Sequence, residues 1–142
     1  ARLASAIMSI GAVKGVEIGD GFQAAAALGS NNNDSFRLDA GKLTKVTNHS
    51  GGTLGGMSDG SPIILRAAVK PTPSISQPQD TVMRTDCQEL TDTTIEITGR
   101  HDPVIVPRAV VVVEAMTAVT VLDLLMHNMS SRLDSLIKFY HS

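Results

Sequence analysis

The sequence has few of the residues that form disulfides, metal sites or nucleic-acid platforms. Its 142 residues include one cysteine, no tryptophan, one tyrosine and three phenylalanines. The single Cys87 excludes an internal disulfide framework and a CxxC metal motif, and it fits a reducing, cytoplasmic setting. The four histidines lack the spacing of metal ligands, so we expect no bound metal.

The charge distribution also argues against nucleic acid as a partner. The formal net charge is −2, and the 12 lysines and arginines are scattered along the chain. Binding to phosphate backbones needs a concentrated basic patch, and binding to single strands needs aromatic side chains on which bases stack. The few aromatic residues here are not interleaved with basic ones, so we predict no nucleic-acid partner.

The pattern of apolar residues predicts an α+β fold in which an antiparallel sheet packs against a long buried helix. Leu3, Ile7 and Met8 recur at helical spacing, and Asp20 is a candidate cap for a small helix. The expected strands cover 13–18, 43–48, 63–69 and 93–98. Helices are expected up to about residue 8 and over 22–28, 107–128 and 130–142, with a surface loop over 30–41 and an irregular stretch over 71–78.

The segment 107–128 carries two competing patterns. Val110–Val113 has strand propensity, but five polar residues recur every three or four positions, which is a helical period: Glu114, Thr117, Thr120, Asp123 and His127. We therefore predict a helix that is apolar around most of its circumference and largely buried. Arg108, Glu114 and Asp123 interrupt it, so we expect a core helix and no membrane partner.

A glycine-rich run over 51–60 contains five of the 12 glycines. It could bring a ligand close to the backbone, but from the run alone a tight hairpin is the better interpretation. Its Gly56–Gly60 part fits GxSxG, the serine-hydrolase motif, with Ser58 as the nucleophile. That motif needs a strand followed by a helix, whereas Pro62 and a predicted strand follow here, so a hydrolase is a distant alternative.

Two further segments carry chemistry. Lys70-Pro71-Thr72-Pro73-Ser74 offers one cation and two hydroxyls from a backbone that two prolines stiffen, either as an anion-binding loop or as a simple strand end. Gly99-Arg100-His101-Asp102-Pro103 places a cation, an imidazole and a carboxylate within three residues. Arg100 can bind phosphate, and His101 and Asp102 can move protons, although local Arg–Asp pairing is the alternative.

These segments occur in the same order in chorismate synthases, which the chain resembles from Ser9 to about Leu125. The stretch 9–22 is similar to the family's SIPAVKGxEIGxGF segment, and 101–116 is similar to its HDPxxxPRAxxxxEAM segment. Two departures are visible: Gly11 stands where proline is usual, and Thr53 where isoleucine is more frequent. Neither departure changes a charged residue of the expected site.

The resemblance implies a carbon–oxygen lyase of the shikimate pathway, within a layered β-α sandwich. It implies conversion of 5-enolpyruvylshikimate 3-phosphate to chorismate and phosphate by 1,4-elimination. The cofactor that it implies is reduced FMN, with involvement of NADPH, and the full-length assembly that it implies is a homotetramer. It also implies site residues: Arg100 and Asp102 as the catalytic pair, with no firm role for His101. The flavin contacts it implies are Ala12, Val13, Gly56, Lys70, Pro71, Thr72, Pro73, Ser74 and Arg100.

The resemblance covers only the C-terminal part of that family. Ala1 stands where an initiator methionine would, already inside an apolar periodic segment, so we expect residues 1–142 to be a piece of a longer protein. The family's HGESHG-like segment and several substrate-binding arginines are absent here. We therefore expect this chain alone to be inactive, and a non-catalytic flavin-binding or assembly module of the same fold is the alternative. The source of flavin reduction stays open.

Overall fold

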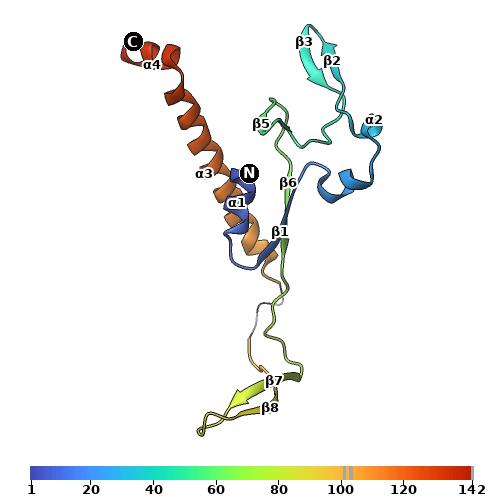
Figure 1. The fold of residues 1–142 in the computed structure, drawn as a ribbon, viewed down its shortest axis with the longest axis vertical. Coiled ribbons are helices and arrows are strands. Elements are labelled where there is room, and N and C mark those ends of the chain that lie inside the picture. The colour runs from blue at the N-terminus through green and yellow to red at the C-terminus, as the bar shows by residue number, and fades with distance from the viewer. Residues whose placement is uncertain (101, 103, 142) are drawn as a thin grey trace.

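The structure, a computed structural model, describes residues 1–100, 102 and 104–141 (Figure 1). Its strands form four separate antiparallel pairs: β1 (Val13–Ile18) with β6 (Leu65–Val69), β2 (Phe36–Asp39) with β3 (Lys42–Lys45), β4 (Thr53–Leu54) with β5 (Met57–Ser58), and β7 (Gln79–Arg84) with β8 (Leu90–Ile95). The predicted antiparallel pairing is confirmed. Among the described residues, no third strand joins any pair, so these pairs replace the single expected sheet.

The helices lie before β1, between β1 and β2, and after β8. They are α1 (Arg2–Met8), a 3-10 helix η1 (Gly21–Ala26), α2 (Gly29–Asn32), α3 (Val106–Ser131) and α4 (Leu133–Tyr140). The arrangement is extended: α3 runs along one side of the β1–β6 pair, while the β7–β8 hairpin projects away from the rest (Figure 1). The α+β class follows, because β2 to β8 run consecutively as antiparallel strands and the longest helix, α3, comes after them.

The core is small and lies where α1 meets α3 and β1. Leu3 and Ile7, four residues apart on α1, are buried together with Val13 at the start of β1. These three are the buried apolar residues of the described chain. Burial of so little apolar surface contributes little to stability, since the hydrophobic effect scales with the area removed from water.

Helix α3 is exposed or half-buried along its whole length, so the prediction of a buried core helix is wrong for this chain by itself. None of its 26 residues is buried, and Val111, Val119 and Leu122 are each more than half exposed. Its apolar window has a mean hydropathy of 2.1, so by length and composition it could cross a membrane. The physical reason for the miss is that the four strand pairs leave most of the helix surface uncovered.

Three local predictions also need correction. The expected surface loop over 30–41 contains α2 and strand β2, which pairs with β3 through a turn at Ala40 and Gly41. Strand β7 was not expected, because Asp80 and Thr81 dilute its apolar pattern; it forms a hairpin with β8. Asp20 precedes η1 but makes no side-chain capping bond; its carboxylate accepts from Asn32 Nδ2 at 3.1 Å.

Candidate functional site

The start of β1 and the end of β6 are held together by backbone hydrogen bonds. We call this paired end, formed by Ala12, Val13, Val69 and Lys70, the ledge. Val13 pairs with Val69, and the Lys70 amide donates to the Ala12 carbonyl oxygen at 2.8 Å. Ala12 has a φ of 67°, a left-handed conformation that alanine seldom adopts. The strand pairing therefore brings Ala12, Val13 and Lys70 together, although Ala12 and Lys70 lie 58 positions apart in the sequence.

The segment beyond Lys70 contains a buried hydroxyl that lacks a hydrogen-bond partner. Thr72 Oγ1 is inaccessible to water and unpaired among the described residues. The Pro73 carbonyl oxygen accepts a hydrogen bond from Gln79 Nε2 at 3.1 Å, and this bond fixes the backbone next to Thr72. An unpaired buried hydroxyl is costly, by about 1–3 kcal/mol, so Thr72 Oγ1 needs a hydrogen-bond partner that the described residues of this chain do not supply. Pro71 and Ser74 complete the segment.

The catalytic candidates lie at the entrance to α3. Asp102 Oδ2 is 2.6 Å from Arg108 Nη1, and both side chains are largely exposed. The cation beside Asp102 is therefore Arg108, to which the sequence analysis gave no role in the site. Arg108 lies six residues after Asp102 in the first turn of α3, and this spacing is the sequence feature that could have indicated the pair. Arg100 is exposed. His101 and Pro103 lie outside the described residues.

Gly56 lies apart from this ledge. It sits in the turn between β4 and β5 with a φ of 82°, and open space surrounds it. The hairpin is attached where Gly19 and Ile64 meet, at the opposite end of the β1–β6 pair from Ala12, roughly 20 Å of strand away. The structure thus brings Ala12, Val13, Lys70 and the 71–74 segment together, but it does not bring Gly56 to them.

The hairpin interpretation of the glycine-rich run is confirmed. Thr53 pairs with Ser58, and Leu54 pairs with Met57. Ser58 therefore lies in a strand that leads to another strand, β6, without the helix that a nucleophile elbow requires. A groove of about 360 Å³ lies beside it, lined by Gly56, Met57 and residues of α1 and α3. Its described lining residues include no histidine that could act as a base for Ser58.

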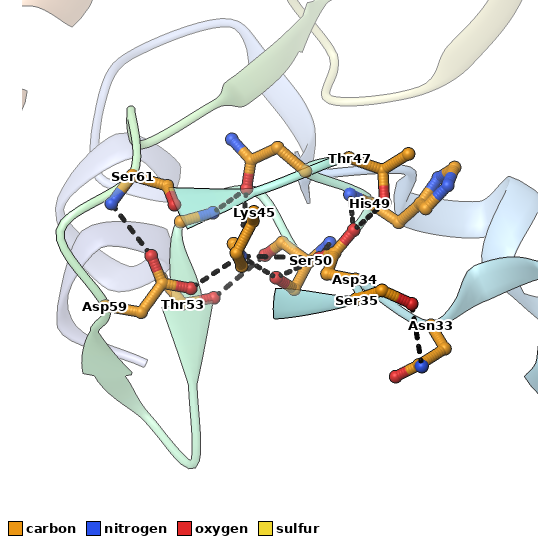
Figure 2. Close-up of polar contacts among 12 residues, drawn as sticks. Asn33, Asp34, Ser35, Lys45, Thr47, His49, Ser50, Thr53, Asp59 and Ser61 are labelled. Carbon is orange, nitrogen blue, oxygen red and sulfur yellow. Dashed lines mark hydrogen bonds and ion pairs between the residues drawn. The ribbon is translucent and has the colours of Figure 1, made fainter. Parts of the chain in front are cut away.

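A buried ion cluster, which sequence reasoning missed, adjoins this hairpin (Figure 2). Lys45 Nζ lies 2.7 Å from Asp59 Oδ2 and 3.4 Å from Asp34 Oδ2. Hydrogen bonding to Asp59 raises the pKa of Lys45, and the same bond lowers the pKa of Asp59. Burial alone would raise the pKa of Asp34, but hydrogen bonds from Ser50 and His49 outweigh burial and hold that pKa well below its usual range.

A second polar contact joins the same loop to β1. His49 Nδ1 lies 2.7 Å from Asp20 Oδ2, with both side chains about one-third exposed. The Asp20 amide also donates to the His49 carbonyl oxygen at 2.8 Å. Among the described residues, no group of three histidine, cysteine, aspartate or glutamate side chains is arranged to hold a metal ion.

Comparison with known proteins decides the family. The family model for chorismate synthase matches residues 1–126. The chain belongs to the chorismate synthase family. A chorismate synthase of Agathobacter rectalis is 62% identical over 140 residues, which cover 99% of this chain and 37% of that protein. One from Archaeoglobus fulgidus is 56% identical over 123 residues, or 87% of this chain and 33% of the relative.

A solved structure agrees with this assignment. The structure titled "Crystal Structure of Chorismate Synthase" superposes with a TM-score of 0.68 at 34% identity, and the match covers 99% of this chain and 34% of that one. The resemblance drawn from the sequence motifs is thereby confirmed. The chain spans about a third of the length of the chorismate synthases it matches.

Proposed function

We propose that this chain is the C-terminal, cofactor-binding part of a chorismate synthase that works in the cytoplasm with reduced FMN. The complete enzyme would convert 5-enolpyruvylshikimate 3-phosphate to chorismate and phosphate by 1,4-elimination. Membership of the family carries the proposal. The unpaired buried hydroxyl of Thr72, within a segment that resembles the family's flavin-contacting loop, is compatible with it.

The residues around Thr72 suit a flavin. Thr72 Oγ1 can donate to or accept from a ligand without displacing a protein partner, because none is present among the described residues. Lys70 is exposed and supplies a cation that can meet a phosphate. Ala12 and Val13 would contribute backbone at the ledge, and Pro71, Pro73 and Ser74 would hold the loop in shape. Reduced FMN, when bound, supplies the electron-rich group that the elimination needs without net redox change.

The chain's own acid–base chemistry centres on Asp102. An elimination that expels phosphate needs a cation near the leaving group and a carboxylate that handles the departing proton. Arg100 is exposed and positioned on the same segment to meet an anionic substrate. Arg108 holds Asp102 by an ion pair of 2.6 Å, which orients the carboxylate oxygen that accepts the proton.

The exposed face of α3 fits a part that works inside a larger assembly. An apolar helix of 26 residues without a buried side chain favours association, because exposed apolar patches of this extent mark contact surfaces. We infer that other parts of the enzyme, or other subunits of a homotetramer, cover α3. The chain alone would then be inactive and prone to self-association.

A chimera tests these proposals. This chain would replace the corresponding 140 residues of the Agathobacter rectalis chorismate synthase, with which it shares 62% identity. We expect the chimera to remain soluble as a tetramer, to bind FMN and to release phosphate from 5-enolpyruvylshikimate 3-phosphate when the flavin is reduced. The isolated chain, assayed in parallel, should aggregate and release none.

The outcomes separate the candidate functions. A chimera that binds FMN but releases no phosphate would favour the alternative, a non-catalytic flavin-binding module. A soluble tetramer that binds no FMN would favour an assembly module. Phosphate release at a full rate by the isolated chain would contradict the proposed dependence on the rest of the enzyme. Supplying either NADPH or chemical reductant identifies how the flavin is reduced.

A further inference from the structure

A second cation lies at the ledge, next to Lys70. Lys14 follows Val13 directly on β1, and Lys70 follows Val69 directly at the end of β6. Because Val13 pairs with Val69, the two lysines are diagonal neighbours across an antiparallel strand pair. Diagonal neighbours lie about 7–8 Å apart, a distance that long side chains can span.

Both lysines lie on the exposed face of the β1–β6 pair. Side chains along a strand alternate between its two faces. On β6, Ala68 is exposed and Val69 is half-buried, and Lys70 after them is exposed again. On β1, Val13 is buried in the core and Lys14 after it is exposed. The two ammonium groups can therefore reach the same point in front of this face.

An irregularity in the strand pairing sets Lys14 apart from its neighbours. Val13 pairs with Val69, and Gly15 pairs with Ala68. The pairing thus advances two residues on β1 but one residue on β6, which makes Lys14 the extra residue of a β-bulge. Bulges redirect a side chain and are frequent next to active sites. This bulge lies at the end of β1 that forms the ledge.

No carboxylate neutralises these lysines within the part of the chain that the structure describes. Neither Lys14 nor Lys70 forms a salt bridge or a side-chain hydrogen bond there. Glu17, further along β1, is already engaged: its Oε2 lies 3.1 Å from Arg66 Nε, and its Oε1 accepts from the Phe22 amide at 3.0 Å. Two neighbouring cations repel each other, and an anion bound between them removes that repulsion.

We propose that Lys14 and Lys70 together bind a phosphate group at the ledge, with Lys14 as an anion-binding residue of the site. The inference rests on the proposed function, in which two ligands carry a phosphate: FMN and 5-enolpyruvylshikimate 3-phosphate. A phosphate monoester suits two lysines, because it has a charge of about −1.5 to −2 at pH 7 and three acceptor oxygens. Each ammonium group can donate to a different oxygen.

Flavin titration of the chimera tests whether the bound group is the phosphate of FMN. Lys14→Met keeps the length of the side chain and removes its charge. It should raise the Kd for FMN, followed by flavin fluorescence, by about tenfold or more. The Kd for riboflavin, which lacks the phosphate, should stay unchanged. Lys14→Arg should restore FMN affinity to within about threefold, because arginine returns a cation.

Steady-state kinetics with the same variants tests whether the bound group is the phosphate of the substrate. In that case Lys14→Met should leave the Kd for both flavins unchanged and lower kcat/KM for 5-enolpyruvylshikimate 3-phosphate about tenfold or more. Lys14→Arg should again restore most of the loss. Lys70→Met should affect the same ligand as Lys14→Met does, since the two lysines share one phosphate.

A matched control is Lys42→Met, at an exposed lysine of β3, which should change neither flavin affinity nor kcat/KM. Wild-type FMN affinity together with wild-type kcat/KM in Lys14→Met overturns the inference and leaves the proposed function intact. An equal loss of FMN and riboflavin affinity also overturns it, because a phosphate contact cannot weaken riboflavin. If the unmodified chimera neither binds FMN nor releases phosphate, the proposed function is overturned and the inference falls with it.

Discussion

Asp102 Oδ2 lies 2.6 Å from Arg108 Nη1, at the point where the chain enters helix α3. Both side chains are about half exposed or more, so the pair contributes little to stability, about 0.2–1 kcal/mol. The ion pair orients the Asp102 carboxylate beside the segment that carries Arg100. A proton-handling group needs a defined position relative to the proton that it takes up.

Replacement of Asp102 separates these two roles. In the chimera, Asp102→Asn should lower kcat for phosphate release by about 100-fold or more, because the amide cannot take up the proton. Its thermal midpoint should change little, since the pair is exposed. Arg108→Gln should lower kcat less than Asp102→Asn does. Equal phosphate release by Asp102→Asn and the unmodified chimera would exclude Asp102 as the catalytic carboxylate.

Thr72 gives a prediction in which stability and binding move in opposite directions. Thr72→Val replaces an unpaired buried hydroxyl with a methyl group of similar size. Without FMN, the free energy of unfolding should rise by about 1 kcal/mol, because the unsatisfied group is removed. FMN affinity should fall about tenfold, because the ligand loses a hydrogen-bond partner. Thr72→Ser keeps the hydroxyl and should preserve FMN affinity; an unchanged affinity in Thr72→Val would place the flavin elsewhere.

Much of the local structure could be predicted from the sequence. The β-rich run 13–18 and the helical period after Pro107 each correspond to an element, β1 and α3, with bounds that agree closely. Local pattern sufficed because these segments are long and strongly periodic. The hairpin within the glycine-rich run was also predicted, since glycine allows the positive φ values of a tight turn.

The remaining features depend on contacts between distant residues. No local pattern reveals that Lys45 meets Asp34 and Asp59, because the three lie on separate segments and look like ordinary surface charges. The exposure of α3 was also missed, since an apolar circumference predicts burial only where other elements cover the helix. In the candidate site, Ala12 meets Lys70 because β1 pairs with β6. The register of that pairing could not be predicted from the sequence alone.

Acid should weaken the Lys45 cluster, and the direction follows from its pKa shifts. The pKa values of Asp34 and Asp59 are lowered from the ordinary value of 3.8. Groups with a lowered pKa in the folded state contribute stability that is present above the ordinary pKa and is lost as the pH falls below it. The pKa of Lys45 is raised from 10.5, so its contribution is lost only above that pH.

The comparison of the chimera with its Asp59→Asn variant measures this effect. At pH 7 the variant should have the lower urea midpoint, because it loses the carboxylate that faces Lys45. The difference between the two midpoints should shrink as the pH falls below about 4, because the unfolded state then binds a proton on Asp59 that the folded state binds only at lower pH. Asp80→Asn, at an exposed carboxylate of β7, is the matched control and should shift the midpoint little at any pH. A difference that persists unchanged to pH 3 would contradict the assignment.

Gly19 gives the sharpest stability prediction, because its surroundings and its backbone both exclude a side chain. Its φ is 59°, and a Cβ atom would overlap the His49 carbonyl oxygen. Gly41, with a φ of 77°, has open space around it and isolates the backbone effect. In the chimera, Gly41→Ala should cost about 1–2 kcal/mol, measured by urea unfolding. Gly19→Ala should cost clearly more, with faster hydrogen exchange over 48–52, because the loop must leave β1. Equal costs for the two substitutions would show that the loop does not dock on β1 as described.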